Sequence, residues 1–383
     1  MKKLSLCGSS WRRALTFVSA FVLCSPGALI AQQYQENDLV SDTQTEPTTP
    51  PNPPDPHLKN PWGLARGTGG PWWVSDNAGG VATIYNGSGV NQGLVVNIPH
   101  PSLVTTPGSP TGIVFNGSSD FTIPSTGKQG LFIFASFDGT ISAWNPNVDL
   151  HNAIQVVGGS PDSILTGATI AQVGDKRYLY VADIKKGEIT VYDTNFKAVE
   201  LSEHAFHEDH VPPGFTPFNV QNIGNNLYVT YAKQNKTKSF ITAGAGLGYV
   251  DVFSPDGKFL MQLQHNDSLN APWGLTLAPS DFGSFSRRVI VGEFGSGWIS
   301  AFDAVTGKFI DNFRDKNNMV LNVGGPEALW SLQFGDGEPN SDPPGVPANA
   351  LFFTAGPLQN GVFHGLFGTI TPLPGDLTQG VDQ

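Results

Sequence analysis

The sequence contains almost no cysteine and few charged side chains. Its two cysteines are Cys7 and Cys24, and only 14% of its 383 residues are charged. Beyond position 24 the chain therefore has no thiolate nucleophile, thiolate metal ligand or disulfide. Its stability has to come from a packed core.

Basic residues are also scarce. The chain has 21 Lys and Arg against 32 Asp and Glu, a formal net charge of −11, and no basic stripe that would bind a phosphate backbone. We therefore expect no nucleic-acid partner. By contrast, 45 Gly and 30 Pro are spread along the chain. They indicate many turns and disfavour a helical bundle.

The first 31 residues have the features of a secretory signal peptide. Four basic residues precede an apolar run at 14–24, and small residues lead to Ala31. We predict cleavage after Ala31, which would remove both cysteines and leave a secreted or periplasmic protein without a membrane span. A membrane anchor or a lipidated Cys24 is the alternative, although the bulky Leu23 disfavours lipidation.

After a Pro/Thr-rich segment at 41–56, which is typical of an extended surface segment, one pattern recurs six times, about every 50 residues. Each copy has a turn and a short apolar strand, a strongly apolar strand, a polar or Gly-rich turn, and an alternating strand. The residues equivalent to Trp62 are Thr111, Thr166, Phe218, Trp273 and Trp330. Turns such as 254–257 then lead to a fourth strand.

Six such units predict an all-β fold, a six-bladed β-propeller of four-stranded blades. The last unit lacks a fourth strand, and the segment 34–40 is expected to supply it and close the ring. The expected parts are a signal peptide (1–31), the closing strand with the Pro/Thr-rich segment (32–56), the propeller (57–374) and a tail (375–383), in a monomer. A pair of β-sandwiches would explain six near-equal repeats poorly.

Several motifs resemble a family of uncharacterised secreted bacterial propellers, some of which end in a PEP-CTERM sorting segment. They are 39–42, 60–64, 214–219, 272–275 with 278–279 and 282–283, and 364–368. The chain departs from the pattern at 292–297 and has no sorting signal before Gln383, which implies release. The resemblance implies a propeller but no activity. More distantly, the architecture is similar to NHL-repeat and gluconolactonase-type propellers.

In a propeller, two sets of connections open on one face, around the mouth of the central channel. They carry the polar residues Asn60, Asp76, Asn77, Thr111, Asp138, Asp183, Asn219, Glu293 and Glu327. Acids that meet there repel one another unless a cation neutralises them. We therefore predict a Ca²⁺ site with Glu293, Asp183, Asn219 and Asn77 as ligands. Alternatively, these side chains cap turns.

Aromatic residues and one histidine complete the expected funnel. Trp62, Phe218 and Trp273 either pack the blades or line the mouth, where aromatics stack on sugars or apolar ligands. His364 is either a base facing the channel or a buried residue that bonds across the ring closure. The expected ligand funnel comprises Asn60, Trp62, Asp76, Thr111, Asp138, Phe218, Trp273, Glu327 and His364.

Two further polar stretches are weaker candidates. The residues 336–342 alternate oxygen donors but lack the bidentate glutamate of an EF-hand, so a solvated loop is favoured over a metal loop. His204, His207 and His210 match no common zinc signature, and they are expected in a polar connection between the third and fourth blades. The sequence has neither a Gly-x-Ser-x-Gly elbow nor a Walker loop.

Composition and motifs favour an exported, non-catalytic propeller that binds a small molecule, a glycan or a protein on its funnel face. The alternative is a Ca²⁺-dependent, lactonase-like hydrolase or lyase at the channel mouth, in which the ion polarises a carbonyl. A structural role in an extracellular matrix is the third possibility. No catalytic residue is assigned.

Overall fold

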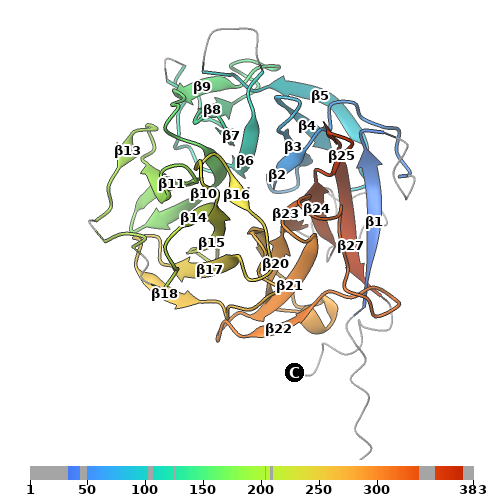
Figure 1. The fold of residues 1–383 in the computed structure, drawn as a ribbon. Coiled ribbons are helices and arrows are strands. Elements are labelled where there is room, and N and C mark those ends of the chain that lie inside the picture. Colours follow the sequence, from blue (N-terminus) through green and yellow to red (C-terminus); the bar gives the residue numbers. More distant parts are fainter. Residues whose placement is uncertain are drawn as a thin grey trace, which may run out of the picture. The chain divides into compact units, whose positions relative to one another are not determined.

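The computed structural model describes residues 33–43, 50–101, 107–124, 126–202, 204–207, 210–335 and 350–373. They form six antiparallel sheets of at least four strands, arranged in a ring (Figure 1). This confirms the predicted six-bladed propeller. The predicted signal peptide, the tail and the stretch 336–342 lie outside the described residues. In the described part, helix is limited to the 3-10 turn η1 (Gly283–Phe285), so no helix there is long and apolar enough to cross a membrane.

In each of the first three blades, four strands follow one another from the centre of the ring outward. Blade 1 consists of β2 (Pro61–Ala65), β3 (Trp72–Asp76), β4 (Val81–Tyr85) and β5 (Asn91–Asn97). Blade 2 consists of β6 (Pro110–Phe115), β7 (Phe132–Ser136), β8 (Ile141–Trp144) and β9 (Ile154–Val157). Blade 3 consists of β10 (Leu165–Val173), β11 (Lys176–Asp183), β12 (Glu188–Tyr192) and β13 (Ala198–Val199).

The other three blades carry additions. Blade 4 consists of β14 (Phe215–Ile223), β15 (Asn226–Gln234), β17 (Gly248–Phe253) and β18 (Phe259–Gln262), and β16 (Ile241–Thr242) also pairs with β15. Blade 5 consists of β19 (Pro272–Leu277), β20 (Arg288–Glu293), β21 (Trp298–Asp303) and β22 (Phe309–Asn312). Blade 6 consists of β23 (Leu329–Phe334), β24 (Leu351–Ala355), β27 (Leu366–Pro372) and β1 (Tyr34–Ser41), with a hairpin of β25 (Leu358–Gln359) and β26 (Val362–Phe363) before β27.

The N-terminal strand closes the ring, as predicted. β1 pairs antiparallel with β27 from Tyr34 opposite Pro372 to Ser41 opposite Leu366 (Figure 1). Tyr34 anchors the strand, because its ring lies 4.3 Å from that of Phe313 and its hydroxyl donates to the carbonyl of Phe282 at 3.2 Å. β27 begins at Leu366, since the backbone of His364 bonds to Pro357 and Asn60.

A β-bulge interrupts the pairing of the first two strands in every blade. The pairing shifts between Pro61 and Leu64 in blade 1, and the residue that recurs at this place in the six blades is Trp62, Thr111, Thr166, Phe218, Trp273 or Trp330. A bulge re-aims a side chain that would otherwise alternate with the pleat. Four of these six side chains are buried aromatics, so the bulges direct rings toward the centre.

The innermost strands approach one another so closely that the residue after the bulge is often glycine. A Cβ on Gly112 would lie 2.6 Å from the backbone nitrogen of Ala168 in blade 3, and one on Gly274 would lie 2.6 Å from the carbonyl oxygen of Trp330 in blade 6. The space enclosed by these strands is only about 20 Å³. The central channel is therefore narrow at this level.

Two of the third strands, whose sequences alternate, are exposed on neither face. β4 and β8 are buried along their whole length. Their polar residues are buried because neighbouring blades cover both faces of each sheet. On the third strands, the hydroxyl of Thr83 donates to Asp76 and the hydroxyl of Ser300 donates to Glu293. Both acceptors lie on second strands.

The Pro/Thr-rich segment is not wholly a surface segment, which corrects the expectation for its last residues. Asp55 is only 5% exposed and accepts hydrogen bonds from Tyr85 and Asn91 of blade 1. Asn52 donates to the carbonyls of Leu39 at 2.9 Å and Ser88 at 2.7 Å. Side-chain hydrogen bonds thus join this part of the segment to the ring closure without a regular strand.

We predict that Gly112→Ala lowers the free energy of unfolding by about 1–3 kcal/mol, since the added methyl group overlaps backbone that cannot move independently. Urea denaturation measures the effect. Gly158→Ala is the matched control, because its Cβ would meet only the end of the Gln155 side chain at 3.6 Å. Equal stability of the two variants would contradict the close approach of the inner strands.

Candidate functional site

Glu293, at the end of β20, is completely buried inside blade 5. Its two oxygens accept hydrogen bonds from the backbone N–H of Asn270 at 2.9 Å and from the hydroxyl of Ser300 at 3.1 Å. Burial raises the pKa of Glu293 to about 8, although these two bonds oppose the change. At neutral pH this residue is therefore mostly uncharged.

Asp76 and Asp183 occupy the corresponding place in blades 1 and 3, and both are fully buried. Burial raises the pKa of Asp76 well above its usual range, and the charge of Asp55 adds to the effect. One oxygen of Asp183 accepts hydrogen bonds from three backbone N–H groups, those of Ile164, Lys185 and Lys186, at 3.0–3.1 Å. Asp183 therefore has the turn-capping role that the sequence left open as the alternative.

The two asparagines proposed as metal ligands also have protein partners. Asn219 donates from Nδ2 to the carbonyl of Trp273 at 2.7 Å, and its Oδ1 accepts from its neighbour Val220 at 2.8 Å. Asn77 donates to the carbonyls of Ser109 and Pro110, and its Oδ1 accepts from Asn60 at 3.3 Å. Both amides join neighbouring blades.

The four predicted ligands therefore bond within their own blades or to a neighbouring one. Among the residues that the structure describes, no three His, Cys, Asp or Glu side chains lie close enough together to hold a metal ion. The Ca²⁺ site stays a prediction from the sequence, to be decided by the measurement described below.

A different feature occupies the mouth of the channel. Six aromatic rings from five blades line a cavity of about 460 Å³, and they are Trp62, Phe137, Phe240, Phe294, Trp330 and Phe363. Trp62 and Trp330 stack with ring centres 3.5 Å apart, and Phe240 meets Phe294 edge to face at 6.0 Å. We call these six residues and their cavity the aromatic mouth. Stacked and edge-to-face contacts of this kind hold the rings against one another.

Polar residues on one side of the aromatic mouth hold its rings in place. The indole N–H of Trp330 donates to Oδ1 of Asn60 at 3.2 Å, and Nδ2 of Asn60 donates to Asn77. Through the further bonds of Asn77, this network connects blades 6, 1 and 2. In the described part of the chain, the buried indole N–H of Trp62 has no hydrogen-bond partner.

Four predicted residues line this one cavity: Asn60, Trp62, Asn77 and Glu327. Phe218 and Trp273 pack in the same hydrophobic cluster but are buried, and the Trp273 N–H donates to the carbonyl of Thr166 at 3.0 Å. Thr111 is buried in the ring, with its hydroxyl 2.8 Å from the carbonyl of Leu165.

The two remaining predicted residues lie elsewhere. Asp138 lines a neighbouring hollow, which shares Phe137 with the aromatic mouth. His364 lies 3.1 Å from the carboxylate of Asp42, and its carbonyl accepts from the backbone of Asn60. His364 thus connects the two ends of the closed ring, which agrees with the second of the two roles considered for it.

Four rings of the aromatic mouth were not predicted from the sequence: Phe137, Phe240, Phe294 and Phe363. A signal existed for two of them, because Phe137 and Phe294 directly follow the second strands of their blades, as Asn77 does. Phe240 precedes β16 and Phe363 belongs to β26. Both lie in additions that do not recur from blade to blade, so the repeat contains no signal for them.

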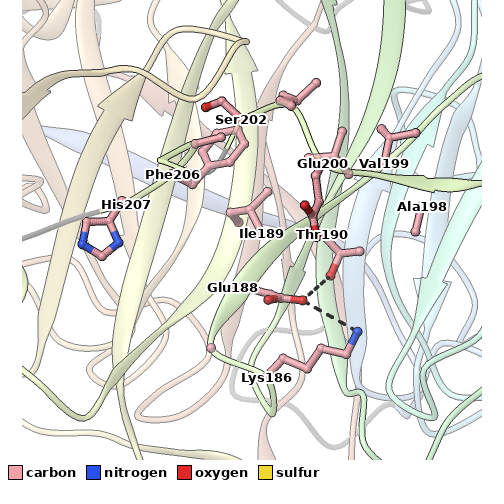
Figure 2. Close-up of a pocket in the computed structure, with 14 residues that line it drawn as sticks. Lys186, Glu188, Ile189, Thr190, Ala198, Val199, Glu200, Ser202, Phe206 and His207 are labelled. Atoms are coloured by element: carbon pink, nitrogen blue, oxygen red, sulfur yellow. Dashed lines mark hydrogen bonds and ion pairs between the residues drawn. The ribbon is translucent and has the colours of Figure 1, made fainter.

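A second cavity, of about 490 Å³, lies at the outer strands of blade 3 (Figure 2). Figure 2 shows Lys186, Glu188 and Thr190 connected by an ion pair and a hydrogen bond, with His207 on the opposite side. His204 and His207 lie between β13 and β14, which confirms the expected connection between blades 3 and 4. This pocket has no ring of aromatic walls.

Comparison with known proteins identifies relatives. Uncharacterized protein R648 of Acanthamoeba polyphaga mimivirus is 31% identical over 329 residues, covering 82% of this chain and 76% of that protein. Uncharacterized protein L690 of the same virus is 32% identical, covering 72% of this chain and 74% of that protein. The chain belongs to the family of these mimivirus proteins. No protein-family model matches the sequence.

Two solved structures have a weak likeness to this chain, at low sequence identity. Virginiamycin B lyase of Staphylococcus aureus is 13% identical, with a TM-score of 0.48 over 89% of this chain and 99% of that chain. A PQQ-bound aldose sugar dehydrogenase of Streptomyces coelicolor is 14% identical, with a TM-score of 0.47 over 88% of this chain and 99% of that chain.

We predict that the free energy of unfolding, measured in chelator, falls between about pH 4.5 and pH 8. The folded state keeps the proton on Glu293 up to about pH 8, whereas the unfolded chain releases it near pH 4.5. Glu293→Gln should make the decline shallower, in urea denaturation at a series of pH values. Glu327→Gln, at an exposed site, is the control. An unchanged slope in Glu293→Gln would show that this carboxyl is not protonated in the folded state.

The predicted Ca²⁺ site leads to a separate expectation. An ion bound to the folded state alone would raise the melting temperature in excess Ca²⁺ and lower it in chelator. Elemental analysis of the purified protein gives the stoichiometry. One Ca²⁺ per chain with a fall on chelation would confirm the site, and no metal with no fall would remove both the site and the hydrolase alternative.

Proposed function

We propose that this propeller is a binding protein that holds a small, largely apolar molecule in the aromatic mouth. The observation that supports this most is the cavity of about 460 Å³ lined by six rings from five blades. Its volume lies in the range of small-molecule sites, which are concave and mostly apolar with a few placed polar groups.

The packing of the mouth also fits a binding site. Trp62, Phe294 and Trp330 are at most 4% exposed, whereas Phe137 and Phe240 are half-buried. The first three rings form a rigid floor, and the other two offer open surface to a ligand. A site whose walls are already ordered loses little conformational entropy on binding.

Export remains part of the proposal. The segment 1–31 has the features of a signal peptide, and the motifs resemble secreted bacterial propellers, but the family members identified above are viral proteins. The Ca²⁺-dependent hydrolase alternative depends on the metal measurement already described. No contact among the described residues favours it over binding.

We predict that the neutral fluorescent probe N-phenyl-1-naphthylamine binds the protein and gains fluorescence in the aromatic mouth. Phe240→Ala should weaken its affinity about tenfold, because burial of a ring contributes roughly 1.5–3 kcal/mol and part of that contact is lost. The measurement is a fluorescence titration.

Phe259→Ala is the matched control, since Phe259 is also half-buried but lies on the outer strand β18. It should leave the affinity unchanged. The proposal would be overturned if the probe did not bind, or if Phe240→Ala and Phe259→Ala lost affinity equally.

A further inference from the structure

Building on the proposed function, we infer that the aromatic mouth selects an organic cation: a quaternary or protonated amine carried on an apolar body. Among the described residues that line the cavity, Glu327 is the sole ionisable one, and it is exposed. This described lining includes no Lys, Arg or His, so an anionic ligand would meet an uncompensated like charge.

The walls of the cavity suit a cation as well. The face of an aromatic ring carries partial negative charge and attracts a cation within about 6 Å of its centre. Trp62 lies at 6.2 Å from both Phe137 and Phe240, with ring planes inclined at 75° and 53°. The three rings line one cavity with their planes in different orientations, unlike a flat stacking surface.

The hydrogen-bonding groups of the mouth argue against a glycan as the main ligand. The side chains of Asn60 and Asn77 bond to each other, to Trp330 and to backbone carbonyls. A sugar needs several free donors and acceptors for its hydroxyls, because burying unpaired hydroxyls is costly. The uncommitted groups of the lining are too few for this, whereas a quaternary ammonium needs none.

A second carboxyl group adds to the negative potential near the mouth. Asp138 lines the hollow on the other side of Phe137. Within the described residues, its Oδ2 is buried and accepts no hydrogen bond, while Oδ1 accepts from the backbone of Thr140 at 3.0 Å. The buried Glu293 contributes little charge at neutral pH, since its pKa is raised to about 8. The field at the mouth therefore comes from carboxylates beside it.

The test compares two probes of the same shape that differ in charge: phenyltrimethylammonium and tert-butylbenzene. Their affinities are measured at fixed ionic strength by displacement of N-phenyl-1-naphthylamine. We expect the cation to bind at least threefold more tightly than its neutral counterpart. Glu327→Gln should weaken binding of the cation by about 3- to 10-fold and leave tert-butylbenzene unchanged.

Two further variants test whether the preference for the cation arises from Glu327 and the aromatic rings of the mouth. Glu188→Gln removes the same charge from the outer pocket of Figure 2, where Glu188 pairs with Lys186 at 3.7 Å. It should leave both affinities unchanged, which excludes the general attraction of an acidic protein for cations. Phe240→Leu keeps an apolar wall but loses the ring face. It should therefore weaken binding of the cation more than binding of the neutral probe.

The outcomes distinguish the two levels of the proposal. The proposed ligand class would be wrong if both probes bound equally, or if Glu327→Gln still preferred the cation. Either result would leave the proposal of an apolar binding site unaffected. If N-phenyl-1-naphthylamine itself fails to bind, or binds independently of Phe240, the proposed function fails first. Circular dichroism melting of each variant shows whether the fold is retained.

Discussion

The close approach of the six innermost strands is the constraint on which the rest of the molecule depends. The strands surround a space of about 20 Å³, and glycines such as Gly112 allow this contact. The centre of the ring is therefore narrow at this level. The bulges direct aromatic side chains toward the centre. Two rings of the aromatic mouth, Trp62 and Trp330, come from these bulges.

Burial changes the pKa of acidic residues that recur in the sequence pattern. Asp76, Asp183 and Glu293 lie at equivalent places in three blades, and each bonds to groups of its own blade. Raised pKa values for Asp76 and Glu293 follow from the loss of water around them. Glu327, by contrast, is exposed at the mouth. Of these four carboxyl groups, only that of Glu327 is exposed to solvent.

Much of the fold was predictable because the same strand pattern recurs six times in the sequence. The apolar second strands, the aromatic or threonine position that recurs at each bulge, and the N-terminal closing strand were all visible as patterns. The candidate site was less predictable. Asn60, Trp62, Asn77 and Glu327 were placed at the mouth by the general geometry of propellers, but the polar network of Asn60 and Asn77 depends on contacts between blades.

The sequence by itself determined six four-stranded blades and their closure, since hydrophobic periodicity and turn residues act locally and recur. Tertiary structure decided which side chains reach the mouth. A bulge changes the direction of one residue without changing the composition of its strand, and Phe240 and Phe363 arrive from additions that occur once each. Contacts between blades join residues that are far apart in the sequence, so they leave no local sequence pattern. The residues that line the cavity could therefore be identified only from the tertiary structure.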